Sequence, residues 1–226
     1  MFNDLREFVH HYGEMGECKV IEGAHWDLEV GAITEWQASL SGSPVLLFDA
    51  IQGYPKGFRV ATNLYTSHKR AAVALGLPAE AGKLEHVRMW RELESRLKPV
   101  PPVEVESGPV LENIQRGEDV DLLKFPVPRW HEKDGGRFIG TGSMVITRDP
   151  EEGWVNLGTE RIQVHSRDTA TVFLSPGRHT DLIRKKYWAQ GKPCPVAIVC
   201  GQDPMLWAAS NFPVPWGSSE YDYAGA

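Results

Sequence analysis

The sequence predicts a mixed α/β protein in two parts: an α/β domain over residues 1–105 and a mostly β, barrel-like domain over residues 106–226. Two observations predict this division. The first hundred residues alternate helical patterns with short apolar strands, whereas the later residues hold mainly short β-like segments separated by glycine and proline. Between them, the proline-rich and acidic segment 99–109 cannot be helical, so it marks a linker or a strand that enters the second domain.

The first domain is expected to contain four helices and three strands. Apolar residues at positions 5, 8, 9 and 12 recur at helical spacing and predict the first helix. The continuous apolar run at 44–48 has strand length without alternation, so it predicts a strand buried on both faces. The other expected elements are strands 18–21 and 58–62 and helices 29–38, 67–75 and 82–97, the last with Leu84, Val87, Trp90, Leu93 and Leu97 on one side.

The second domain is expected to be built mainly from strands. Its β-like segments lie at 138–147, 154–164, 170–174 and 195–200, and one helix is predicted at about 180–190. The densest basic cluster of the chain, residues 184–186, falls on this helix. It is too short to bind nucleic acid and is interpreted as a solvated helix face.

Composition excludes several classes of function. The 226 residues carry a net charge of −6, which argues against a nucleic-acid partner. No apolar run is long enough to span a bilayer, and the first residues lack the apolar core of a signal peptide. The three cysteines (Cys18, Cys194 and Cys200) form no C-x-x-C motif, so we expect reduced structural thiols and a cytoplasmic protein.

Three polar residues each end a β-like segment: Asn156, His179 and Glu220. An amide oxygen, an imidazole nitrogen and a carboxylate suit Mg²⁺ or Mn²⁺ better than Zn²⁺. Spacing alone does not establish a site. Asn156 is also a residue type that ends strands, His179 is placed to cap or begin the next helix, and Glu220 fits a solvated loop.

Longer motifs carry a resemblance to a known family. The segments WVNLGTERIQ, SPGRH, FPVPWGSSEYDYAGA and ENIQRGEDVDLLKFPVPRWHEKDGG resemble those of UbiD-like decarboxylases. The segments DLREFV, EVGAITEW, SPVLLFDAIQGYPKGFRVATNLY and AAVALGL are similar to the first domain of the same family. The resemblance covers nearly the whole chain in order. It implies that residues 106–226 form part of a split β-barrel that binds flavin.

The resemblance also implies a set of site residues. Asn156, His179 and Glu220 would bind Mn²⁺ or Mg²⁺, with K⁺ as a further cation, and this metal would hold the phosphate of prenylated FMN. Arg161, five residues after the asparagine, would be catalytic beside the substrate carboxylate. The residues expected along the cofactor are Thr141, Asn156, Gly158, Thr159, Glu160, Arg161, Val172, Phe173, Leu174, Gly177, Arg178, His179 and Glu220.

The activity implied is the reversible, non-oxidative decarboxylation of an aromatic or α,β-unsaturated carboxylic acid. A flavin prenyltransferase would supply the cofactor, and the full-length protein would be a homo-oligomer. The family's proton donor and C-terminal domain lie beyond residue 226, so we expect the chain to be truncated. Two alternatives remain open: a non-catalytic flavin carrier or accessory subunit of a split decarboxylase, which Arg161 argues against, and a nicotinamide-dependent flavin reductase, which the metal ligands argue against.

Overall fold

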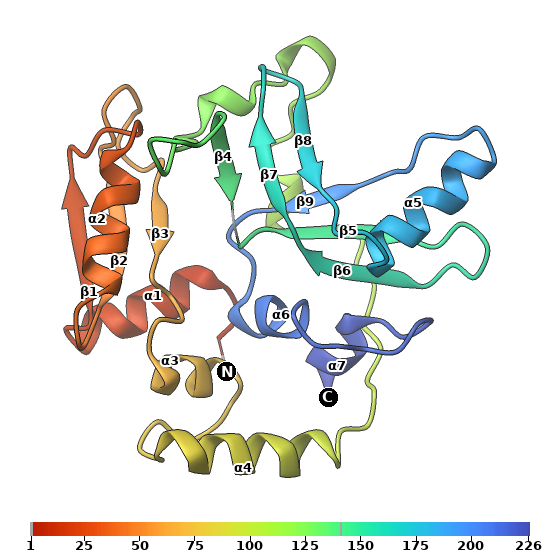
Figure 1. Cartoon of the computed structure of the whole chain (residues 1–226), viewed down its shortest axis with the longest axis horizontal. Coiled ribbons are helices and arrows are strands. Elements are labelled where there is room, and N and C mark those ends of the chain that lie inside the picture. Colours follow the sequence, from red (N-terminus) through yellow and green to blue (C-terminus); the bar gives the residue numbers. More distant parts are fainter. Residues whose placement is uncertain (1, 141) are drawn as a thin grey trace.

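The structure is a computed structural model that describes residues 2–140 and 142–226, and it confirms a mixed α/β chain (Figure 1). The helices are α1 (Leu5–Glu14), α2 (Glu29–Ala38), α3 (His68–Ala74), α4 (Lys83–Glu94), α5 (His179–Ala189), α6 (Pro204–Ala209) and α7 (Glu220–Gly225). The strands are β1 (Cys18–Glu22), β2 (Val45–Asp49), β3 (Val60–Thr62), β4 (Arg137–Gly140), β5 (Met144–Arg148), β6 (Val155–Thr159), β7 (Arg161–Val164), β8 (Ala170–Phe173) and β9 (Ala197–Val199). None of the helices in the described ranges has the length and apolar character needed to cross a membrane.

The first sheet has the order β1-β2-β3, with β1 parallel and β3 antiparallel to the central strand. Successive side chains of β2 point to opposite faces. Leu46 and Phe48 pack in one core with Val30 of α2, whereas Val45 packs in a second core with Phe8 of α1. The prediction of a strand buried on both faces at 44–48 is therefore confirmed.

The second half contains two antiparallel sheets, β4-β7-β8 and β6-β5-β9. The segments expected as single strands at 138–147 and 154–164 are each divided between these two sheets. The buried residue Glu160 separates β6 from β7 and marks where the chain passes from one sheet to the other. Within the described ranges the strands close no barrel, so the split barrel stays a prediction, as does the domain division at 105/106.

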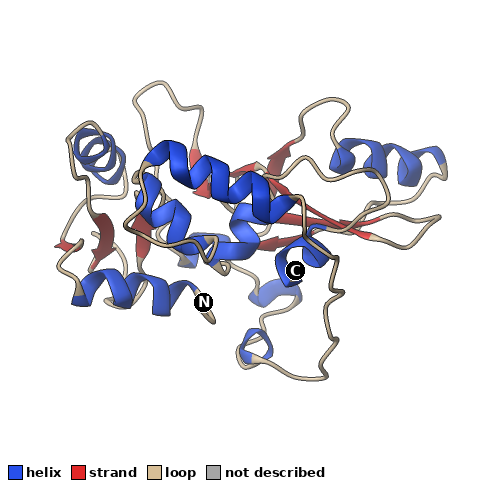
Figure 2. Ribbon diagram, turned by 90° about the horizontal axis from the view of Figure 1, so that it is seen from below, coloured by secondary structure: helices blue, strands red, loops and turns tan. Residues whose placement is uncertain are grey.

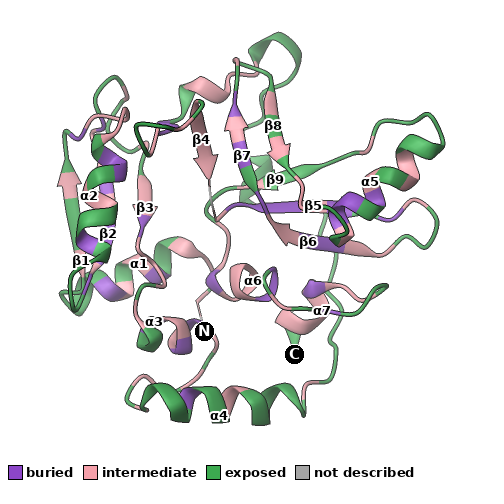
Figure 3. Ribbon diagram, in the orientation of Figure 1, coloured by how far each residue is buried: buried purple, intermediate pink, exposed green. Residues whose placement is uncertain are grey.

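The prediction of an apolar face along helix 82–97 was wrong at Leu84, Val87 and Leu93, which are exposed. Leu84 is 76% and Val87 is 52% exposed on α4, which runs along the underside of the molecule and lies nearest the viewer in Figure 2. The helix is anchored instead by buried His86 and by Trp90, whose ring lies 4.8 Å from that of Phe212. Figure 3 accordingly shows α4 as mostly exposed.

Contacts between distant segments hold the first sheet against the second half of the chain. The Arg129 Nε lies 2.5 Å from Asp27 Oδ1, and the rings of Tyr65 and Trp207 stack at 4.0 Å. Helix α2 also touches backbone directly at Gly31, where an added Cβ would lie 1.8 Å from the carbonyl oxygen of Trp130. These contacts hold the first sheet in a fixed position against the second half of the chain, which carries the polar residues of the candidate site.

The interpretation of the basic cluster at 184–186 as a solvated face fits Lys185, whose side chain is 56% exposed, but not Arg184 and Lys186, which are ion-paired and 24% exposed. Arg184 and Lys185 reach Asp181 at 2.5 and 2.7 Å. Lys186 Nζ lies 2.8 Å from Asp149, whose other oxygen accepts two backbone hydrogen bonds in the β5–β6 turn. Burial alone would raise the pKa of Asp149, but the Lys186 ammonium and these amides outweigh it and lower the pKa below 3.8.

We expect Gly31→Ala to destabilise the fold by about 3 kcal/mol or more, because a methyl group meets backbone that cannot rotate away. Urea unfolding of the purified protein measures this. The matched control is Gly13→Ala in helix α1, where an added Cβ meets nothing within 4 Å. Gly13→Ala should raise the free energy of unfolding by up to about 1 kcal/mol. Equal changes in the free energy of unfolding for both variants would show that the contact at Gly31 does not restrict a side chain there.

We expect Asp149→Asn to cost about 1 to 2 kcal/mol at pH 7, because it removes the buried one of three carboxylates that face the Lys186 ammonium, while Glu151 and Glu152 remain at 3.0 and 3.6 Å. A lowered carboxyl pKa stabilises the fold above the unfolded value of 3.8, and this contribution is lost as the pH falls through the folded value. The difference in free energy of unfolding between wild type and variant, measured by urea titration, should therefore become smaller below pH 3.8. Asp168→Asn, in the exposed β7–β8 turn, is the control and should change stability far less.

Candidate functional site

The strand β6 carries Asn156 into the interior, where the residue is 2% exposed. Asn156 is the second residue of β6, so the prediction that it ends a strand was wrong. Its Nδ2 donates to Thr180 Oγ1 at 3.1 Å, which leaves the amide oxygen available to accept or to ligate. Since Thr180 follows His179 directly, this hydrogen bond holds the N-terminus of α5 against β6.

His179 is the first residue of α5 and does not end a strand. Burial, assisted by the positive charge of Arg178, lowers the pKa of its imidazole, so the ring is neutral at pH 7. Neither ring nitrogen forms a hydrogen bond with the residues that the structure describes. A neutral imidazole with an unengaged nitrogen is the form that binds a metal.

Glu220 reaches the same strand from helix α7, of which it is the first residue. The prediction that Glu220 ends a β-like segment was therefore wrong. Its Oε2 accepts from the backbone N–H of Leu157 at 2.8 Å. That amide is available because β6 is an edge strand, paired with β5 on one side only. The hydrogen bond places the carboxylate beside residue 157, one position after Asn156.

The environment of Glu220 lacks a compensating charge. The residue is 4% exposed, and among residues 2–140 and 142–226 it has no Lys or Arg partner. Burial raises its pKa to about 7, and the Leu157 amide opposes this only in part. A divalent cation would supply the missing positive charge, so the amide oxygen, imidazole and carboxylate fit Mn²⁺ or Mg²⁺.

Side chains that sequence analysis did not assign to the site surround these residues. The rings of Trp154 and Trp216 pack edge-to-face against His179, with centroids 5.5 and 5.3 Å away. Thr180 ties Asn156 to α5. The described residues hold no cluster of three His, Cys, Asp or Glu side chains placed to bind a metal, so the set depends on the amide of Asn156.

The other predicted cofactor-side residues of β6 and β7 extend from this cluster. Gly158 leaves little room for a side chain, because a Cβ would lie 3.1 Å from Thr180 Oγ1 and the hydroxyl would have to shift. Thr159 Oγ1 lies 2.7 Å from Ser210 Oγ, and burial raises the pKa of Glu160. The exposed Arg161 lies with its guanidinium carbon 5.8 Å from the ring centre of Phe173. Thr141 lies outside the described residues.

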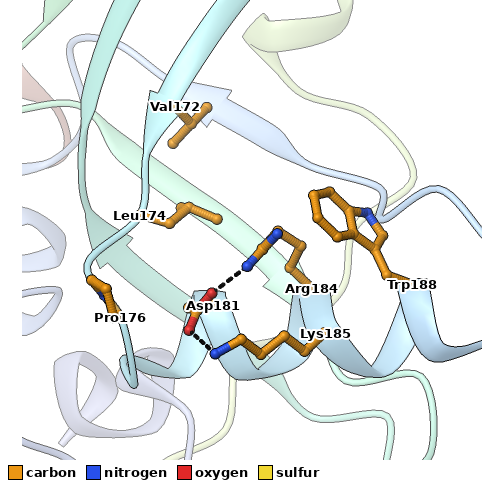
Figure 4. Close-up of a pocket in the computed structure, with 7 residues that line it drawn as sticks. All are labelled: Val172, Leu174, Pro176, Asp181, Arg184, Lys185 and Trp188. Carbon is orange, nitrogen blue, oxygen red and sulfur yellow. Dashed lines mark hydrogen bonds and ion pairs between the residues drawn. The ribbon is translucent and has the colours of Figure 1, made fainter.

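A separate cavity of about 490 Å³ lies between β8 and α5 (Figure 4). Val172 and Leu174, both predicted along the cofactor, point into it, but the three candidate metal ligands do not line it. The other lining residues are Pro176, Asp181, Arg184, Lys185 and Trp188. The turn before α5 is set by Gly177, which has a φ of +80° and donates its N–H to Asp181 at 3.0 Å. Arg178 then occupies the N-cap position of the helix, and its side chain makes no capping hydrogen bond. The predicted site residues thus form two groups on different sides of α5.

Comparison with known proteins identifies relatives along the whole chain. Residues 12–88 match the 3-octaprenyl-4-hydroxybenzoate carboxy-lyase N-terminal domain, and residues 102–226 match the Rift-related domain of the same family. Pyrrole-2-carboxylic acid decarboxylase of Pseudomonas aeruginosa is 36% identical over 99% of this chain and 46% of its own length. Phenolic acid decarboxylase of Sedimentibacter hydroxybenzoicus is 31% identical over 100% and 48%.

Solved structures of related decarboxylases also resemble this chain. Vanillic acid decarboxylase of Sedimentibacter hydroxybenzoicus, in its closed form, superposes with a TM-score of 0.90 at 29% identity, covering 100% of this chain and 48% of that one. An evolved dimeric UbiD-class enzyme of Pelotomaculum thermopropionicum, in complex with prFMN, gives 0.85 at 30% identity, covering 99% and 50%. The chain spans about half the length of the curated relatives it matches. Matches to both domain models and across these structures show that the chain belongs to the UbiD family.

Proposed function

We propose that this chain serves the reversible, non-oxidative decarboxylation of an aromatic or α,β-unsaturated carboxylic acid, using prenylated FMN held through a divalent metal. The observation that carries the proposal is the buried Glu220 carboxylate bonded to β6 beside Asn156, whose amide is tied to the residue after His179. Named relatives that act on pyrrole-2-carboxylic and phenolic acids support the substrate class, and a family structure solved with prFMN supports the cofactor.

In this proposal the chain's residues position and neutralise charge. Asn156, His179 and Glu220 would hold Mn²⁺ or Mg²⁺, which would supply positive charge to offset the negative charge of the flavin phosphate. When bound, the flavin supplies a carbon centre that takes up the electron pair left by departing CO₂. Arg161 has no ion-pair partner among the described residues, so its planar fork is available for the substrate carboxylate.

The proposal extends to the protein's partners. A flavin prenyltransferase would supply the cofactor, and copies of the full-length chain would associate. A flavin carrier or accessory subunit without its own chemistry is the competing function. A carrier has no use for a cation facing the substrate, so Arg161 separates the two.

We expect Glu220→Gln to abolish metal-dependent flavin retention, because glutamine can still accept from the Leu157 amide but carries no charge for the cation. His179→Ala should do the same by removing the imidazole. Both variants of the full-length protein would be loaded with Mn²⁺ and prenylated FMN, and bound flavin measured after gel filtration. Glu85→Gln, at an exposed position of helix α4, is the control. Wild-type retention by both variants would exclude the metal site.

We expect Arg161→Ala in the full-length protein to retain flavin but to lower kcat by about 10²- to 10³-fold, because the guanidinium contacts substrate and not the phosphate. Arg161→Lys keeps the charge without the two-pronged geometry and should lose less. Turnover of pyrrole-2-carboxylate and of phenolic acids would be followed by CO₂ release. Near-wild-type turnover of Arg161→Ala would contradict the role of this arginine and favour the carrier.

A further inference from the structure

Three aromatic rings meet beside the candidate metal ligands. The rings of Trp154, His179 and Trp216 contact one another pairwise, with centroids 5.5, 5.0 and 5.3 Å apart and interplanar angles between 81° and 89°. Such edge-to-face packing is directional, so each ring restricts the rotation of the other two. The imidazole of His179 is the third member of an otherwise indole cluster.

Each ring comes from a different ligand-bearing segment. Trp154 lies two residues before Asn156, at the entry to β6, and Trp216 lies four residues before Glu220, at the entry to α7. His179 itself begins α5. The aromatic contacts therefore join, side chain to side chain, the three segments that the Asn156–Thr180 and Leu157–Glu220 hydrogen bonds join along β6.

Trp216 is also held from its outer side. Lys186 lies seven residues after His179, about two helical turns, and so on the same face of α5. Its Nζ lies 5.0 Å from the centre of the Trp216 ring and is itself fixed by Asp149 at 2.8 Å. The indole Nε1 of Trp216 faces Glu152 Oε1 at 3.4 Å. Although 38% exposed, the indole is bound between α5 and the β5–β6 turn.

A metal-binding histidine needs its ring orientation fixed, and proteins commonly fix it with a hydrogen bond to the second ring nitrogen. No described residue makes that bond to His179. The two indoles are the groups that contact its ring. Packing thus takes the place that a carboxylate or carbonyl acceptor occupies in other sites.

We propose that Trp216, together with Trp154, is a positioning residue of the metal site: it orients the His179 imidazole and holds the loop before Glu220 against α5. The proposal rests on the proposed function, because it assigns a role toward the cation that Asn156, His179 and Glu220 would bind. Lys186 supports it by holding the Trp216 ring in place.

The test compares Trp216→Ala, Trp216→Phe and the control Trp36→Ala, an indole that is 61% exposed on α2. Mn²⁺ affinity of the full-length, flavin-free protein would be measured by calorimetry. We expect Trp216→Ala to weaken binding by about 10- to 100-fold, the range found for residues that orient metal ligands. Trp216→Phe should restore affinity to within about threefold of wild type, since a benzene ring preserves the edge-to-face contact, and Trp36→Ala should have no effect.

A second readout needs no metal. The Hε1 proton of His179, assigned by its loss in His179→Ala, lies in the ring-current field of both indoles, so its NMR shift should move in Trp216→Ala and far less in Trp36→Ala. If Trp216→Ala does not fold, Trp216→Leu fills much of the volume without a ring and carries the same expectation. Near-UV circular dichroism would show whether Trp216→Ala and Trp216→Leu fold. If neither folds, the test depends on Trp216→Phe: weakened Mn²⁺ affinity together with a displaced His179 resonance in that variant would overturn the proposal.

The outcomes separate this inference from the proposed function. If the wild type does not bind Mn²⁺, or His179→Ala binds it equally well, the metal site itself is wrong and the positioning role falls with it. If the wild type binds, His179→Ala does not, and a folded Trp216→Ala binds within about threefold with an unmoved His179 resonance, the aromatic positioning role is overturned while the metal site stands.

Discussion

The open edge of β6 is the constraint on which the rest of the site depends. Because this strand pairs with β5 alone, the Leu157 N–H has no partner in the sheet and must find one elsewhere. The Glu220 carboxylate provides it, and in doing so becomes buried without a countercharge among the described residues. A hydrogen bond that satisfies the backbone thus creates an electrostatic demand. The shift of the Glu220 pKa to about 7 corresponds to about 3 kcal/mol, lost from the metal-free fold as the pH rises from about 4.5 to 7.

Two helices pack closely against β6. Helix α7 reaches the open edge of the strand, and α5 packs over it at Thr180. Gly158 permits the second approach, since any side chain there would press on the Thr180 hydroxyl. Asn156, Gly158 and Glu220 therefore belong to one packing arrangement. Asn156 and Glu220 belong to the proposed ligand set, and Gly158 lies beside it.

The sequence predicted those parts that rest on local pattern. The apolar run of β2 and the periodicity of α1 were sufficient, because burial on two faces or on one stripe is written into neighbouring residues. The site was accessible only through motif resemblance, since its contacts join residues 156, 180 and 220. Helices α6 and α7 were missed because each has only six residues. The cap at Asp203 or Ser219 carries more of their signal than periodicity does. Trp216 gave no local sign of its role, because its partners are His179, Trp154 and Lys186.

Helix α5 separates two environments that share its residues. His179 and Lys186 face the aromatic cluster and the acidic β5–β6 turn, whereas Asp181, Arg184, Lys185 and Trp188 line the cavity against β8. Asp181 connects the two sides, because it accepts from the Gly177 amide that shapes the turn before His179 and pairs with both cations on the cavity side. These partners, Lys185 first, lower its pKa far below the usual range, so it stays ionised at any pH at which the protein works. The position of His179 is consequently set from within its own helix as well as by the indoles. Thr180 lies between the two environments, because its hydroxyl accepts from Asn156 and the residue also lines a second hollow with Val172 and Leu174.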